Sequence, residues 1–132
     1  MGSHILANPT TFKGQAFPNA NGDTQCVEFI KQTLKAPATS LWKEGKKVVK
    51  GDQTIPSGTA IATFVNGAYP QAGSTNKHAA IYLGQNSLGI EVLDQWKPKD
   101  GKVQSVAPRT IKFKPTTPGL SNDGNAFSVI EW

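Results

Sequence analysis

The segment Thr24-Gln25-Cys26-Val27-Glu28-Phe29-Ile30-Lys31-Gln32-Thr33-Leu34 predicts the helix around which the rest of the chain is arranged. Its apolar residues recur at the three- and four-residue spacing of one helical face. Polar residues just upstream can cap the first turn, because their side chains accept hydrogen bonds from its free N–H groups. With Pro37 ending the pattern, the segment predicts a helix over about residues 24–35 that carries Cys26 in its first turn. The candidate caps are Asn21, Asp23 and Thr24.

The residues before this helix contain no regular pattern. Residues 5–22 are rich in Asn, Pro, Gly and Thr and predict an irregular lead-in. The opening Met1-Gly2-Ser3-His4 looks like the remnant of an expression tag, so His4 is left out of the candidate site. A chain of 132 residues fits one domain. We therefore expect residues 5–132 to form a single domain behind a remnant at 1–4.

Beyond the helix, short strands alternate with turns. A second short helix between Thr39 and Lys50 is possible, with Trp42 as its apolar anchor. Asn66-Gly67 is a turn signal, although the residues up to Asn76 suggest a longer loop. Helices first and strands afterwards predict an α+β domain with an antiparallel sheet. Strands are expected at 59–65, 78–83, 90–96, 103–106, 109–114 and 126–130, with turns at 55–58, 84–89 and 97–102.

The composition permits several functions and excludes others. The net charge of +5 favours anionic partners such as nucleic acid or cell-wall polymer. The densest basic group, Lys43, Lys46, Lys47 and Lys50, is more simply interpreted as a solvated face. One usable histidine without cysteine pairs does not make a zinc site, and no Gly-x-Ser-x-Gly motif is present.

The single cysteine excludes an internal disulfide and suggests a free reactive thiol. No apolar run reaches the roughly 18 residues of a membrane span. The N-terminus does not carry the pattern of a signal peptide. A role outside the cell of origin would therefore require dedicated secretion machinery.

Cys26 and His78 can act as a nucleophile and its base. A thiol attacks an amide only as the thiolate, and the N–H groups and dipole of a helix start favour that anion. A neighbouring imidazole takes the thiol proton and becomes the counter-ion. Cys26 lies at the predicted helix start, and His78 opens a predicted strand. The same helix start offers a backbone N–H to the oxyanion formed by the attack.

A third residue should hold the imidazole in one tautomer. Side chains alternate along a strand, so His78 and Tyr82 share one face. Ile90 and Asp94 share one face of the next strand. Pairing Tyr82 with Ile90 places His78 opposite Asp94, whereas a slip of one residue places Gln95 or neither residue there. Register therefore decides the third member, with Asp94 preferred and Gln95 as the alternative.

Each of these residues also has a purely structural interpretation. A lone cysteine on the apolar side of a helix is more often packed and inert. A lone histidine at a strand start is likewise more often structural. The catalytic interpretation is nevertheless preferred, because three features occur together: Cys26 at a helix start, His78 at a strand start and an acid in the adjoining strand. They follow one another along the chain in the same order as in one known architecture.

Two motifs resemble a known group of enzymes. Residues 24–29 (TQCVEF) and 77–84 (KHAAIYLG) resemble the CHAP and NlpC-type papain-like cysteine peptidases, in which a Gln-Cys pair opens a helix and a His heads a strand. Four further stretches narrow the resemblance to the second family of type VI secretion amidase effectors, over about residues 23–131. They are 36–45, 58–64, 92–96 and 125–131.

The resemblance implies a papain-like fold in which an N-terminal helix carrying the cysteine packs on an antiparallel sheet. It implies a peptidoglycan amidase with Cys26 as nucleophile and His78 as base, acting without cofactor or metal. Such effectors are delivered by the type VI apparatus into the periplasm of a target bacterium, where they cleave wall peptides. The expected bond is the crosslink between D-alanine and meso-diaminopimelate. The implied partners are peptidoglycan, the secretion apparatus and a cognate immunity protein, with no nucleic acid and no membrane insertion.

Three residues are weaker candidates for binding the oxyanion or the substrate: Gln25, Gln95 and Trp42. Gln25 could direct its amide at the oxyanion or simply begin the helix. Trp42 and Trp96 could stack on substrate, but are more simply core or rim aromatics. Tyr82 shares a strand face with His78 and could point into the cleft, but packing within the sheet is the preferred interpretation. The alternative function is a non-catalytic module that binds cell wall or nucleic acid through its basic surface, in a salt-sensitive way and with an unreactive Cys26.

Overall fold

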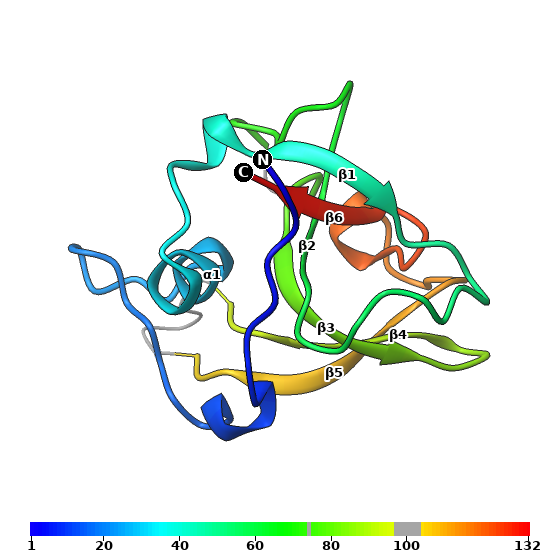
Figure 1. The fold of residues 1–132 in the computed structure, drawn as a ribbon, viewed down its shortest axis with the longest axis horizontal. Helices are drawn as coiled ribbons and strands as arrows, with labels where there is room; N and C mark the ends of the chain where they lie inside the picture. The colour runs from blue at the N-terminus through cyan, green and yellow to red at the C-terminus, as the bar shows by residue number, and fades with distance from the viewer. Residues whose placement is uncertain (74, 97–103) are drawn as a thin grey trace.

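The computed structural model, which describes residues 1–73, 75–96 and 104–132, contains a curved antiparallel sheet with one α-helix packed against it (Figure 1). The strands follow the order β1-β6-β2-β3-β4-β5 across the sheet. This arrangement confirms the predicted combination of a helix with an antiparallel sheet. The strands are β1 (Lys43–Lys47), β2 (Ala60–Thr63), β3 (Ala79–Gln85), β4 (Gly89–Asp94), β5 (Ala107–Lys112) and β6 (Phe127–Glu131).

Helix α1 (Cys26–Leu34) begins at the cysteine itself. Its N-cap is Gln25, and no side chain caps the first turn, so the three predicted caps are wrong. Thr24 instead donates its hydroxyl to the carbonyl of Trp96 at 2.9 Å. The helix ends at Lys35, whose φ of 54° lies in the left-handed region that ends many helices. Among the described residues, no N-cap side chain bonds to the first-turn N–H groups at the cysteine.

Two apolar clusters cover the two faces of the sheet. Side chains alternate along each strand, so Ala60 and Ala62 of β2 face the helix while Ile61 faces away. The small alanines leave room for Phe29 and Ile30 of α1, both fully buried. The second cluster lies on the opposite face of the sheet and includes Tyr82, Ile90, Val92, Ile111 and Phe127. The first cluster fixes the helix against β3, beside the residue that precedes that strand.

The second predicted helix is absent. Residues Thr39–Leu41 form one turn of 3-10 helix, and β1 follows at the edge of the sheet, paired with β6. The lysines of β1 are exposed. Their spacing gives no apolar helical face, and an edge strand rich in lysine is a common way to end a sheet. Backbone pairing with β6 therefore decides the conformation of this segment.

The later strands differ from prediction in their number and bounds. The two strands expected at 103–106 and 109–114 are replaced by the single strand β5, and residues 104–106 are not in a strand. The charged turn expected at 97–102 lies outside the described residues. Asn66 and Gly67, both with positive φ, make a tight turn closed by two hydrogen bonds between Val65 and Ala68, and the expected longer loop follows it.

The two chain ends lie side by side (Figure 1). Ser3 forms a β-bridge with Glu131, and the His4 ring stacks on Trp132 with ring centroids 3.7 Å apart. The residues expected to be a tag remnant thus pack against the last strand. None of the helices in the described ranges is long and apolar enough to cross a bilayer.

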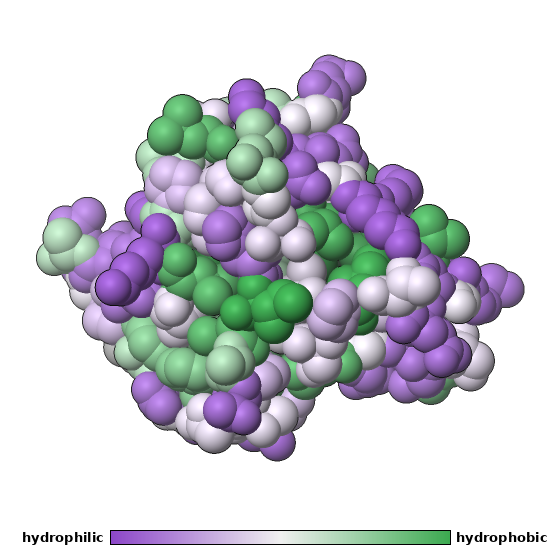
Figure 2. All heavy atoms as spheres, in the orientation of Figure 1, coloured by the Kyte–Doolittle hydropathy of each residue, from purple (hydrophilic) through white to green (hydrophobic). Residues whose placement is uncertain are grey.

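The surface seen in the orientation of Figure 1 carries both apolar and hydrophilic side chains. Figure 2 shows apolar areas lying between hydrophilic ones on this face. All four lysines of the predicted basic group, Lys43, Lys46, Lys47 and Lys50, are exposed.

Candidate active site

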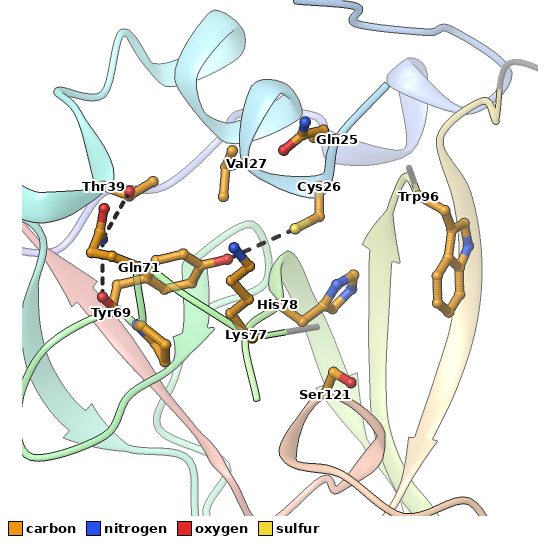
Figure 3. A pocket seen from close by; sticks show the side chains of 12 residues that line it. Gln25, Cys26, Val27, Thr39, Tyr69, Gln71, Lys77, His78, Trp96 and Ser121 are labelled. Carbon is orange, nitrogen blue, oxygen red and sulfur yellow. Dashed lines mark hydrogen bonds between the residues drawn. The ribbon is translucent and has the colours of Figure 1, made fainter. Parts of the chain in front are cut away.

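A cavity of about 440 Å³ opens where the first turn of α1 meets the segment that leads into β3. Cys26 and His78 both line it, together with Tyr69, Lys77 and Trp96 (Figure 3). The helix start and the strand start predicted to carry the nucleophile and the base therefore meet at one pocket.

Cys26 is half-buried, with its sulfur directed into the cavity (Figure 3). Burial favours the neutral thiol. The charge of the His78 imidazole and hydrogen bonds from His78, the Ala79 backbone and Tyr69 outweigh it, so the pKa of Cys26 lies below its usual value. The thiol is therefore predisposed to lose its proton to the histidine that faces it.

His78 is buried immediately ahead of β3. Its backbone is fixed to β2, because its N–H donates to the Thr63 hydroxyl and its carbonyl accepts from the Thr63 N–H, both at 3.0 Å. Nε2 contacts Oδ2 of Asp94 at 2.6 Å, which leaves Nδ1 for the thiol. Burial alone would lower the pKa of His78. The charge of Cys26 and the hydrogen bond to Asp94 raise it to about 9.

Asp94 meets His78 although the predicted strand register is wrong. Tyr82 lies opposite Val92 instead of Ile90, which displaces the pairing by two residues. A displacement of two keeps every side chain on its own face. Asp94, the last residue of β4, therefore reaches His78 diagonally. A β-bulge between Tyr82 and Gly84 separates this register from the one at the hairpin end.

Arg109 belongs to the same cluster and was missed by the sequence analysis. Its Nε donates to Oδ2 of Asp94 at 2.7 Å, and its guanidinium lies 4.1 Å from the centre of the Trp96 ring. Arg109 lies opposite Val92 in the β4–β5 pairing, two residues from Asp94 on the same face. The available signal was composition, because Arg109 is the only arginine in the chain.

Trp42, a predicted substrate residue, is 1% exposed and does not line the cavity. Its Nε1 donates to the Pro37 carbonyl at 3.1 Å, and its ring meets that of Tyr69 edge-on at 5.1 Å. Stacking of Trp42 on a substrate is therefore wrong for this structure, because Tyr69 occupies the space between it and the cavity. Trp96 is 41% exposed at the rim and lies 5.6 Å from the His78 ring.

Gln95, the alternative third residue and a substrate candidate, points away from the cavity. It is fully buried, and its side-chain amide bonds to both backbone groups of Phe17 and to the Gln25 carbonyl. Neighbouring residues of a strand face opposite sides, so the contact of Asp94 with His78 turns Gln95 the other way. Gln25 itself lines the cavity beside Cys26 (Figure 3).

Among the residues that the structure describes, no three acidic, histidine or cysteine side chains gather closely enough to hold a metal ion. The reactive groups in and beside the cavity are a thiol, an imidazole and a carboxylate. Nucleophilic attack on a carbonyl is the reaction these groups can support.

Several known proteins are similar to this chain in sequence and in fold. The sequence profile of the domesticated amidase effector 2 family matches residues 2–130. A type VI secretion amidase effector 2 protein of Salmonella typhi is 39% identical over 114 residues, covering 81% of this chain and 84% of that protein. Domesticated amidase effector 2 of Ixodes scapularis is 30% identical over 126 residues, covering 93% of this chain and 82% of that protein.

A solved structure, described as a type 6 secretion amidase effector 2, superposes with a TM-score of 0.81 at 34% identity. The match covers 97% of this chain and 94% of that one. The resemblance predicted from the motifs is thereby confirmed: this chain belongs to the amidase effector 2 family, whose members include type VI secretion effectors and domesticated forms.

Proposed function

We propose that this protein hydrolyses amide bonds in the peptides of bacterial cell wall, with Cys26 as nucleophile and His78 as base and then acid. The observation that carries the proposal is the convergence of the two side chains on one cavity, with the pKa of Cys26 lowered and that of His78 raised. Shifts of opposite sign in neighbouring groups are what a thiolate–imidazolium pair requires. The names of the relatives supply the reaction class.

The reaction would proceed in two halves. The Cys26 thiolate attacks the amide carbon, forming a C–S bond and an oxyanion. Collapse breaks the C–N bond, and His78 gives its proton to the leaving amine, leaving a thioester. Water then attacks the thioester while His78 takes a proton from it, and collapse breaks the C–S bond to release the acid. Asp94 would hold the imidazole through Nε2 during both halves.

Several finer assignments belong to the same proposal. We place the fold with the papain-like enzymes of the CHAP and NlpC type, on the strength of the helix-borne cysteine and the strand-borne histidine. The expected bond is the D-alanine–meso-diaminopimelate crosslink. The expected route is type VI secretion into the periplasm of a target bacterium, with a cognate immunity protein protecting the producer.

Digestion of purified peptidoglycan tests the proposal. Wild-type protein should release fragments whose masses identify the bond, and Cys26→Ala should release none while melting like wild type. Retention of full cleavage by Cys26→Ala would sink the mechanism. Salt-sensitive binding of wild type to the polymer without any cleavage would favour the non-catalytic module instead.

A further inference from the structure

The hydroxyl of Tyr69 lies at the nucleophile. It is 3.9 Å from the Cys26 sulfur, within hydrogen-bonding range for sulfur. Tyr69 comes from the loop between β2 and β3, and in Figure 3 it approaches the sulfur from a different side than His78. This side chain has no part in the proposed transfer of protons, yet it ends in the reaction cavity.

The Tyr69 ring is held rigidly. The side chain is 5% exposed. Trp42 packs edge-on against it at 5.1 Å, and Trp42 is itself fixed by its bond to Pro37 and by stacking on Trp132. The Gln71 amide donates to the Tyr69 carbonyl at 3.0 Å. A donor fixed before the reaction needs no reorganisation as charge develops, which is the condition for strong stabilisation of a transition state.

The hydroxyl also keeps its proton. Burial and the charge of Cys26 raise the pKa of Tyr69 far above its usual value. Tyr69 therefore remains a donor throughout the range in which the enzyme could work, and it is not a base.

We propose that the Tyr69 hydroxyl is the side-chain donor of the oxyanion hole, with the backbone N–H at the start of α1 as its partner. The oxyanion is two covalent bonds from the sulfur, so a hydroxyl 3.9 Å from the sulfur can reach it at about 2.7–3.1 Å, the distance required of such donors. When the Cys26 sulfur bonds to the carbonyl carbon, the carbonyl π electrons move to oxygen. Tyr69 donates a hydrogen bond to that oxygen without giving up its proton, and again when water attacks the thioester.

This inference rests on the proposed amidase reaction, and its test uses the only other tyrosine in the chain as a control. Tyr82 is equally buried, belongs to the apolar cluster on the opposite face of the sheet and has a hydroxyl partner of its own in Gln85. Tyr69→Phe and Tyr82→Phe therefore remove the same atom from two buried sites. Only the first should act on the reaction.

The measurement is kcat and KM on solubilised wall peptides, with the alkylation rate of Cys26 by iodoacetamide at the same pH. Tyr69→Phe should lower kcat by about 100- to 1000-fold, with KM nearly unchanged and a much smaller loss of alkylation rate. Tyr82→Phe should keep wild-type kcat. A kcat of Tyr69→Phe within threefold of wild type, or a loss fully matched by slower alkylation, would overturn the inference. If the wild type is active and Cys26→Ala is inactive, the proposed function holds whatever the result for Tyr69→Phe, so the two proposals can fail separately.

If Tyr69→Phe melts below the assay temperature, fluorotyrosine at position 69 keeps the ring and the hydroxyl. Fluorine makes the hydroxyl a stronger donor, so kcat should rise at unchanged KM. An unchanged kcat would again overturn the inference.

Discussion

His78 and Arg109 share a single acceptor atom. Nε2 of His78 and Nε of Arg109 both contact Oδ2 of Asp94, at 2.6 and 2.7 Å. Within the described part of the chain the other carboxylate oxygen, Oδ1, is buried without a partner. Nη2 of Arg109 also lies 3.2 Å from Nε2 of His78, so the arginine, the carboxylate and the imidazole form one compact cluster. The orientation of the imidazole therefore depends on a single carboxylate oxygen, whose own position is fixed by the arginine beside it.

Replacing Arg109 should loosen this arrangement. Arg109→Gln leaves the buried Asp94 carboxylate with His78 as its remaining charged partner, and we expect unfolding to become easier by about 1.5–3 kcal/mol, the usual value of a hydrogen bond to a charged group. Urea unfolding measures this loss. Lys46→Gln is the control, since it breaks an ion pair of similar length between Asp52 and the exposed Lys46 side chain, where solvent screens the charges and a much smaller loss is expected. Equal effects of the two variants would argue against a special role for Arg109.

The pH dependence of activity should depend on Asp94. His78 must be protonated to give a proton to the leaving amine, so kcat/KM should fall as the pH rises through about 9. Because Asp94 raises the pKa of His78, Asp94→Asn should move this basic limb to lower pH. It should also lower kcat/KM by about tenfold or more, since Asp94 holds the imidazole in the tautomer and orientation that proton transfer by His78 requires. A basic limb that stays in place in Asp94→Asn would contradict the assignment.

Gln95 should matter for stability. Gln95→Ala removes three buried hydrogen bonds that link the lead-in segment to the residue before the helix. It leaves backbone groups of Phe17 and Gln25 without these partners, so we expect a loss of at least about 2 kcal/mol. Thermal and urea unfolding check this value. The exposed Gln53→Ala should change stability by less than about 0.5 kcal/mol. A Gln95→Ala protein as stable as wild type would show that water replaces these bonds at little cost.

The sequence predicted the central pair because each residue has a local signature. The helix at Cys26 follows from apolar spacing, and His78 stands at the head of a continuous apolar run that predicts a strand. The contact between Asp94 and His78 was predicted despite the wrong register. The face of the sheet on which a side chain lies changes only when the strand pairing is displaced by an odd number of residues, and here it is displaced by two. A displacement of one residue would have turned the Asp94 side chain away from His78.

Tyr69, Arg109 and the strand β1 could not be found in this way. Tyr69 lies in a loop, where no periodicity relates side chains to a face. The position of Arg109 depends on the pairing of β4 with β5, and the sequence between these strands carries no register signal. Strand β1 forms through pairing with β6, some 80 residues away in the chain, which outweighs local preference. Trp42 takes the core position that was the simpler of its two interpretations, packed against Tyr69.

The claim on which the whole account depends is that the Cys26 thiol is ionised by His78 in the folded protein. The pH dependence of iodoacetamide alkylation measures this directly, and the single cysteine makes the mass change unambiguous. We predict that the wild-type thiol titrates below the value of a free thiol, about 8.5, and that His78→Ala returns the titration toward that value. A wild-type titration at that free-thiol value, unaltered by His78→Ala, would contradict the account.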